Sequence, residues 1–110
     1  PVLFLFVLAL GSSAYAELPD SVAFERRVYS SDVGSLPYRI MFPENYDPGK
    51  KYPLVIFLHG SGERGSDNAK QLLHGGQWLV DNLRGKHPAI VIAPQCPEDD
   101  YWAHVKREVL

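Results

Sequence analysis

An uninterrupted apolar run at residues 54–58 (LVIFL) constrains the fold of this chain more than any other feature. A half-exposed strand alternates apolar and polar residues, whereas a run without alternation is typical of a parallel strand covered on both faces. A second such run, residues 89–93 (AIVIA), follows after a segment with helical periodicity. Strand, helix and strand in this order predict a βαβ unit within a parallel sheet, in which residues 54–58 form a central strand and residues 89–93 an apolar edge.

Two segments upstream predict an antiparallel hairpin beside this unit. Residues 22–29 and 36–42 alternate in polarity, and residues 30–35, with Asp32 and Gly34, have the composition of a turn. The alternation places apolar side chains on one face of each strand, namely Val22, Phe24 and Val28 in the first and Leu36, Tyr38, Ile40 and Phe42 in the second.

A helix is predicted over residues 69–83, capped by one of Ser66, Asp67 and Asn68. Its apolar face consists of Leu72, Leu79 and Leu83. Residues 75–76 are both glycine and cost roughly 1 kcal/mol each in a helix interior, so a break or bend is expected there. Residues 101–110 are predicted to begin another helix.

The first sixteen residues are predicted to be a secretory signal peptide that lacks its positive n-region. Residues 2–10 are all apolar, and residues 11–16 are mostly small and end in an Ala-x-Ala pattern. The apolar run is too short for the roughly 20 residues of a membrane-spanning helix. The chain is therefore expected to be secreted or periplasmic, with residues 17–110 belonging to one globular domain.

Charge and residue usage exclude several kinds of partner. The net charge of −2 over 110 residues argues against nucleic acid or an anionic membrane surface. The four histidines have no metal-ligand spacing, so no metal is expected. Cys96, the one cysteine, is either a small buried thiol or the partner of a cysteine outside this chain.

Two chemistries compete for the loop that follows residues 54–58. Gly60, Gly62 and Gly65 spell G-x-G-x-x-G, the pattern of a dinucleotide-binding oxidoreductase. That pattern requires an acidic residue about 20 positions on, at the end of the next strand, to hold the ribose. The next strand instead ends in Pro94-Gln95, and the first acid beyond it is Glu98. The ribose anchor is therefore missing.

The other chemistry is acyl transfer, in which a loop of His-Gly-Gly-Gly type donates backbone N–H groups to an oxyanion hole. Here the loop reads His59-Gly60-Ser61-Gly62. Glycine lets the backbone come close to the developing alkoxide, and one such donor is worth about 3 kcal/mol in the transition state. The amide of Ser61 is the first candidate donor and that of Gly62 the second.

Four segments resemble secreted α/β-hydrolases of the esterase and predicted-peptidase type, related to the prolyl oligopeptidase, feruloyl esterase and phospholipase/carboxylesterase groups. They are LPYR at residues 36–39, YD at 46–47 with KYPLV at 51–55, HGSGERG at 59–65 with DN at 67–68, and APQCP at 93–97. The resemblance implies the N-terminal part of one α/β-hydrolase domain. It also implies a serine hydrolase without a cofactor, acting on small-molecule or polymer-linked carboxylic esters, with peptides as a further possibility.

The catalytic nucleophile of that family has no counterpart in these 110 residues, because no G-x-S-x-G occurs. The triad of this fold follows the oxyanion loop in the order Ser, acid, His, so all three residues are expected beyond Leu110 and the chain alone is expected to be inactive. Ser61 is rejected as the nucleophile because no triad partner lies at suitable spacing. A non-catalytic binding protein on the same fold is a further alternative.

Five further residues in and around the loop have predicted roles. His59 is expected to hold the glycine loop by hydrogen bonding rather than to act in catalysis. The substrate-side candidates are Glu63, Arg64, His74 and Trp102.

Overall fold

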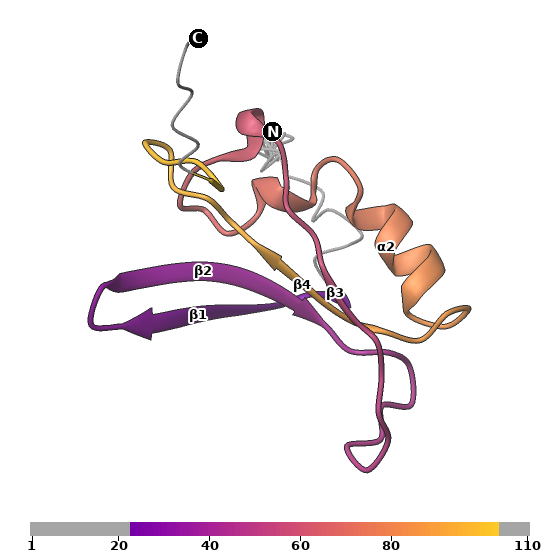
Figure 1. Cartoon of the computed structure of the whole chain (residues 1–110). Helices are drawn as coiled ribbons and strands as arrows, with labels where there is room; N and C mark the ends of the chain where they lie inside the picture. Colours follow the sequence, from indigo (N-terminus) through magenta and orange to yellow (C-terminus); the bar gives the residue numbers. More distant parts are fainter. Residues whose placement is uncertain (1–22, 104–110) are drawn as a thin grey trace, which may run out of the picture.

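The computed structural model describes residues 23–103, which form one mixed β-sheet with a helix packed against it (Figure 1). The predicted signal peptide lies outside these residues. The elements in chain order are β1 (Glu25–Ser31), β2 (Gly34–Met41), β3 (Leu54–Ile56), the 3-10 turns η1 (Ser61–Glu63) and η2 (Lys70–Leu72), α2 (Gly76–Leu83) and β4 (Ile90–Pro94). The strand order is β1-β2-β4-β3. Strands β3 and β4 are parallel with α2 between them in sequence, so the predicted βαβ unit is confirmed.

Strands β1 and β2 form the predicted hairpin at one edge of the sheet. Their register runs from Glu25 opposite Ile40 to Ser31 opposite Gly34, which leaves a two-residue turn. The predicted apolar face of the first strand is only partly correct, because Phe24 is buried whereas Val28 is largely exposed. The reason is that β1 is an edge strand whose far end extends beyond the core (Figure 1).

Strand β4, and not β3, lies in the centre of the sheet. It pairs antiparallel with β2 on one side and parallel with β3 on the other. The predictions of a central strand at residues 54–58 and of an open edge at residues 89–93 are therefore wrong for the described part of the chain. Only one face of β3 is covered there, since Leu54, Ile56 and Leu58 remain 59%, 60% and 53% exposed. An apolar run indicates that both faces of a strand are suited to burial. Residues 23–103, however, cover only one face of β3.

The hydrophobic core lies between the sheet and the α2 side of the chain. Its buried members are Phe24, Met41, Leu72, Leu79, Val91 and Ala93, with Ala23, Val55, Phe57, Val80 and Leu83 packed around them. The predicted helical face is thus confirmed for Leu72 and Leu79, and Leu83 lies at its border. On β2, Ile40 of the predicted apolar face is buried, but so are Arg39 and Met41 on the opposite face, because that face meets the core.

The predicted helix over residues 69–83 is broken at its glycine pair, as expected. The turn η2 ends at Leu72 and α2 begins at Gly76, while Gly75 has φ 115°. Residues 101–103 form no helix, and the rest of the second predicted helix lies outside the described residues. Among residues 23–103 no helix has the length and apolar character needed to cross a membrane.

Replacing Gly75 with alanine is expected to lower the free energy of unfolding by about 2 kcal/mol. The positive φ disfavours any side chain, and the added Cβ would lie 3.1 Å from Cζ of Phe57. The matched control is Gly34→Ala, which has φ 143° and no atom within 4 Å of the new Cβ, and which we expect to cost about half as much. Urea denaturation of both variants measures the difference. Equal losses would show that the contact with Phe57 has no effect.

Candidate active site

Two loops meet where β3 and β4 end, as the parallel pairing of these strands requires. The first follows β3 through residues 57–65, and the second follows β4 through residues 95–100. The amide of Cys96 donates a hydrogen bond to Nε2 of His59 at 2.9 Å, and the amide of Gly65 donates to the carbonyl oxygen of Cys96 at 3.0 Å. The glycine loop is therefore attached to the β4 loop at two points.

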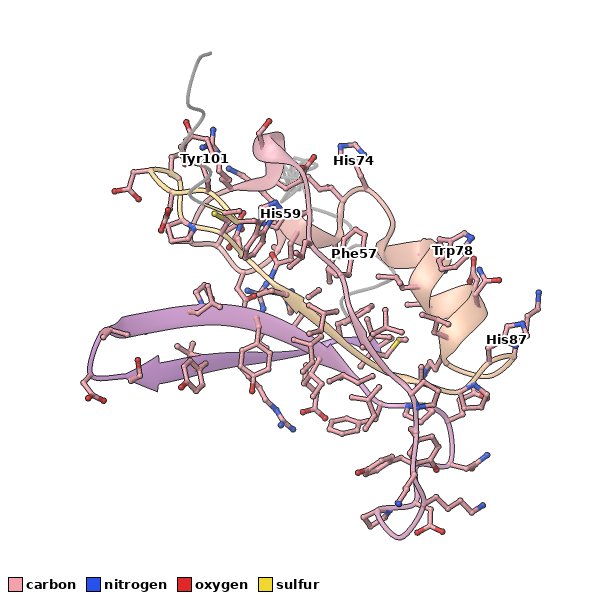
Figure 2. The ribbon with its side chains drawn as sticks, viewed as in Figure 1. Phe57, His59, His74, Trp78, His87 and Tyr101 are labelled. Carbon is pink, nitrogen blue, oxygen red and sulfur yellow. The ribbon has the colours of Figure 1, made fainter. Side chains whose placement is uncertain are left out.

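The buried His59 ring holds the glycine loop from within (Figure 2). Because Nε2 accepts from Cys96, the ring proton lies on Nδ1, which donates to the carbonyl oxygen of Gly60 at 2.6 Å. The indole Nε1 of Trp102 donates to the carbonyl oxygen of His59 at 2.9 Å, with the two rings edge to face. His59 thus has the loop-holding contacts predicted for it.

A small pocket of about 100 Å³ opens between the two loops. Its lining residues are His59, Gly60, Ser61, Arg64, Cys96, Tyr101 and Trp102. The structure therefore brings together three of the predicted site residues, Ser61, Arg64 and Trp102. Cys96 is buried, and burial raises the pKa of its thiol.

The backbone at the start of η1 presents two unpaired donors beside this pocket. The first N–H groups of a helical turn have no partner within the turn. Here the amide of Glu63 donates to the carbonyl oxygen of Gly60 at 3.3 Å, whereas the amides of Ser61 and Gly62 donate no hydrogen bond within residues 23–103. A Cβ added at Gly62 would meet no atom within 4 Å. The space beside the Cα of Gly62 is therefore open.

Glu63 and His74 lie next to each other at the side of the pocket rather than in it. Nε2 of His74 is 3.3 Å from Oε1 of Glu63, and their side chains are 80% and 13% exposed. In Figure 2, His74 and Tyr101 appear on opposite sides of His59. Neither Glu63 nor His74 lines the pocket, so the structure does not bring these two candidates to the same place as Trp102.

Sequence reasoning missed a buried polar network beneath the glycine loop. Its members are Arg39, Asn68, Gln71 and Gln95, all buried. Nε of Arg39 donates to the carbonyl oxygen of Asn68 at 2.6 Å, and the Asn68 amide donates to Oε1 of Gln95 at 2.6 Å. Nε2 of Gln95 donates to the carbonyl oxygen of Glu63 at 3.1 Å. The network thus connects β2 and β4 to the loop.

A signal for this network was present in the sequence. Three of the segments that carried the family resemblance, at residues 36–39, 67–68 and 93–97, contain Arg39, Asn68 and Gln95. Asn68 also has φ 51°, a conformation that asparagine tolerates better than most residues. Each of these polar residues lies in a separate segment that resembles the same family. Their contact in the folded chain could therefore have been predicted.

The N-cap residue of η2 is Ala69 and not one of the three predicted caps, but Asp67 accepts hydrogen bonds from the backbone at the start of this turn. Its Oδ1 accepts from the amides of Ala69 and Lys70 at 3.0 and 3.2 Å and from Nε2 of Gln95 at 2.8 Å. Burial raises the pKa of this carboxyl, but the hydrogen bonds from Gln95, Lys70 and Ala69 and the charge of Lys70 outweigh it, so the pKa is lowered. Asp67 is therefore held as a carboxylate at the foot of the loop.

The dinucleotide alternative gains no support from the loop geometry. A pyrophosphate site uses the N-terminus of an α-helix that begins in the glycine loop. Gly60–Gly65 instead contains the three-residue turn η1, and α2 begins only at Gly76. Within residues 23–103 no three metal-binding side chains lie close enough together to hold an ion.

Comparison with known proteins identifies the fold. No family model matches the chain, and no curated protein matches it. A solved thermostable esterase matches with a TM-score of 0.61 and 36% identity over 74% of this chain and 23% of the esterase. A CE1 ferulic acid esterase of the anaerobic fungus Anaeromyces mucronatus matches with a TM-score of 0.46 and 22% identity, over 76% of this chain and 34% of the esterase.

The described residues therefore form part of an α/β-hydrolase fold. Within that fold the chain is similar to esterases, as the sequence motifs predicted. The chain spans about a quarter of the length of the thermostable esterase that it matches.

Proposed function

We propose that the complete protein containing this chain is a serine hydrolase of carboxylic esters, and that residues 59–65 form its oxyanion loop. One observation carries the proposal: the amides of Ser61 and Gly62 have no partner within residues 23–103, and Ser61 lines a pocket at the carboxyl ends of two parallel strands. Ligands of open α/β sheets bind at that edge. The similarity to a solved thermostable esterase supports the same reaction class.

The proposed chemistry uses these amides when a nucleophile attacks the ester carbonyl. The carbonyl oxygen then becomes an alkoxide, and N–H groups already aimed at it stabilise the charge without reorganisation. The serine, acid and histidine are proposed to lie beyond Leu110, because the triad of this fold follows the oxyanion loop in sequence. Trp102 and Tyr101 would form the wall of the acyl or alcohol pocket, and no cofactor takes part. We also propose that residues 1–16 are a leader peptide and that the enzyme acts outside the cell or in the periplasm.

Hydrolysis of p-nitrophenyl acetate by the complete protein tests this function. We expect turnover that a serine-reactive phosphonate abolishes with one equivalent bound. A folded complete protein without hydrolysis, or a reading frame without G-x-S-x-G after Leu110, would overturn the proposal. Binding of a nicotinamide cofactor in the absence of hydrolysis would instead favour the dinucleotide alternative, and ester binding without turnover would favour a non-catalytic binding protein.

A further inference from the structure

The two proposed donor amides belong to peptide units whose carbonyl oxygens are each held by a side chain. The carbonyl oxygen of Gly60 accepts from Nδ1 of His59 at 2.6 Å, and that of Ser61 accepts from Nε of Arg64 at 3.0 Å. We infer that His59 and Arg64 are positioning residues, which orient the amides of Ser61 and Gly62 toward the oxyanion. This inference rests on the proposed function. Neither side chain contacts the oxyanion, because each acts by orienting a backbone amide.

The planarity of the peptide bond connects each side chain to its donor. In a trans peptide unit the C=O of one residue and the N–H of the next point in opposite directions. The described residues contain no cis peptide bond. A hydrogen bond that fixes the Gly60 carbonyl therefore also fixes the direction of the Ser61 N–H, and the bond to the Ser61 carbonyl does the same for the Gly62 N–H.

The His59 ring also makes contacts on its other side. Its Nε2 is occupied by the Cys96 amide, which belongs to the loop after β4. The carbonyl oxygen of His59 is held by the indole of Trp102. The ring is thus hydrogen-bonded both to the loop after β4 and to the Gly60–Ser61 peptide unit.

Arg64 is fixed by a second pair of contacts. Its Nη1 donates to the carbonyl oxygen of Asp100 at 3.1 Å, and its guanidinium lies 5.1 Å from the ring centroid of Tyr101. Two nitrogen atoms of the side chain are therefore engaged with backbone carbonyls of this chain. This arrangement favours a positioning role over the predicted role in substrate binding.

Two substitutions of His59 separate its two hydrogen bonds in the complete enzyme. In His59→Asn, the amide nitrogen lies near the position of Nδ1 and can still donate to Gly60. In His59→Gln, the amide oxygen lies near the position of Nε2 and can still accept from Cys96, but the bond from residue 59 to the Gly60 carbonyl is lost and only the longer bond from the Glu63 amide remains. We expect kcat for p-nitrophenyl acetate to fall about tenfold in His59→Gln, the rate equivalent of one hydrogen bond, with KM unchanged, and to fall much less in His59→Asn. Equal losses, or a greater loss in His59→Asn, would overturn the role of His59.

The role of Arg64 is tested by the separate effects of Arg64→Lys on kcat and on KM. Lysine lacks the planar fork that reaches both carbonyl oxygens, so we expect kcat to fall with KM unchanged. A raised KM with unchanged kcat would show that Arg64 binds substrate instead.

Nuclear magnetic resonance of the unmodified complete protein tests the geometry apart from activity. The ¹⁵N shifts of the His59 ring are expected to show a protonated Nδ1 and an unprotonated Nε2, and the opposite tautomer would overturn the inference even if no variant folds. The ¹³C shift of the Gly60 carbonyl should change in His59→Gln and stay close to wild type in His59→Asn. If the wild-type protein hydrolyses no ester, the proposed function fails, whereas these shifts still decide whether His59 orients the peptide unit.

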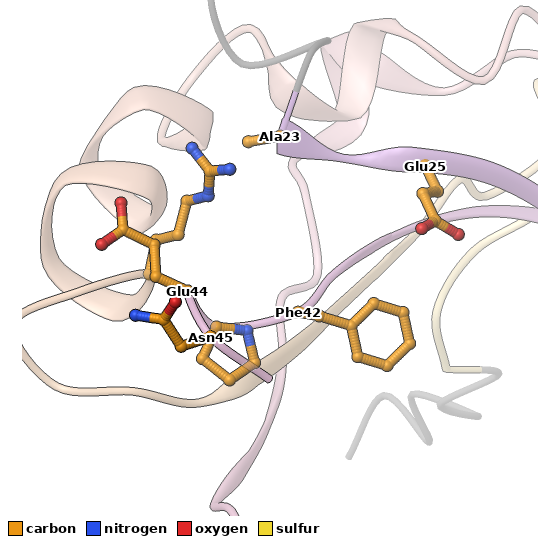
Figure 3. A pocket seen from close by; sticks show the side chains of 7 residues that line it. Ala23, Glu25, Phe42, Glu44 and Asn45 are labelled. Atoms are coloured by element: carbon orange, nitrogen blue, oxygen red, sulfur yellow. The ribbon is translucent and has the colours of Figure 1, made fainter. Parts of the chain in front are cut away.

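Outside this site, a cavity with a volume of about 430 Å³ lies at the start of β1 (Figure 3). It is lined by Ala23, Glu25, Phe42, Pro43, Glu44, Asn45 and Arg84. None of its charged side chains is buried, so nothing there indicates a ligand.

Discussion

Replacing Ser61 with proline is expected to lower kcat of the complete enzyme by about 10²- to 10³-fold, the usual cost of losing one oxyanion donor. Proline removes the N–H of residue 61 and nothing else that the turn requires. Gly60 has φ −80° and ψ 179°, the extended conformation that a residue before proline prefers. Residue 61 is the first position of η1, where proline fits without the loss of a hydrogen bond.

Ser61→Ala is the matched control, because it retains the N–H and removes only the hydroxyl. We expect its kcat to stay within about threefold of wild type, a change below 1 kcal/mol in the barrier. Steady-state kinetics and circular dichroism of both variants give the comparison. If the alanine variant were as inactive as the proline variant, the hydroxyl of Ser61 would be the required group and its rejection as nucleophile would be wrong.

Replacing Gln95 with leucine is expected to lower the free energy of unfolding of the complete protein by about 3 kcal/mol. Gln95 is 0% exposed, and its side chain bonds to the Asn68 amide, the Glu63 carbonyl and the Asp67 carboxylate. Leucine has nearly the same volume, but it removes the partner of the Asn68 amide and of the Glu63 carbonyl and one of the three hydrogen bonds to the Asp67 carboxylate. Buried unpaired polar groups are costly.

The same substitution at an exposed glutamine is the control for Gln95. Nε2 of Gln77 donates to Oδ1 of Asp81 at 2.8 Å on the surface of α2. Gln77→Leu is expected to change stability by only about 0.5 kcal/mol, because water can replace the lost partner. Urea denaturation with a constant m-value measures both variants. Similar losses at the two positions would mean that the buried network does not stabilise the loop.

The sequence pattern predicted which strands and helices form more accurately than it predicted the order of the strands in the sheet. Periodicity identified the hairpin, the βαβ unit and the helix break at Gly75, because each depends on residues close together in the chain. It placed residues 54–58 in the centre of the sheet, where the structure places β4. Strand order depends on pairing between distant segments such as Met41 and Val91, about which local periodicity carries no information.

The candidate site was predictable to the extent that it depends on the backbone. The motif at residues 59–62 singled out the amides of Ser61 and Gly62, which donate no hydrogen bond within residues 23–103, and it predicted the hydrogen bonds of His59. The oxyanion role of these amides stays a prediction. It did not indicate that Arg64 turns back to the Ser61 carbonyl, since the direction of a long charged side chain depends on partners such as Asp100. The pairing of Glu63 with His74 was hidden for the same reason.

The central position of β4 determines the order in which this region can assemble during synthesis. Strands β2 and β3 each pair with β4 and not with each other, so only the hairpin can form before residue 94 has left the ribosome. Until then the apolar residues of β3 have no strand partner within the described part of the chain. Closing the sheet also requires pairing across long loops, which slows folding. The nascent chain is therefore expected to depend on protection from aggregation until its last described strand is made.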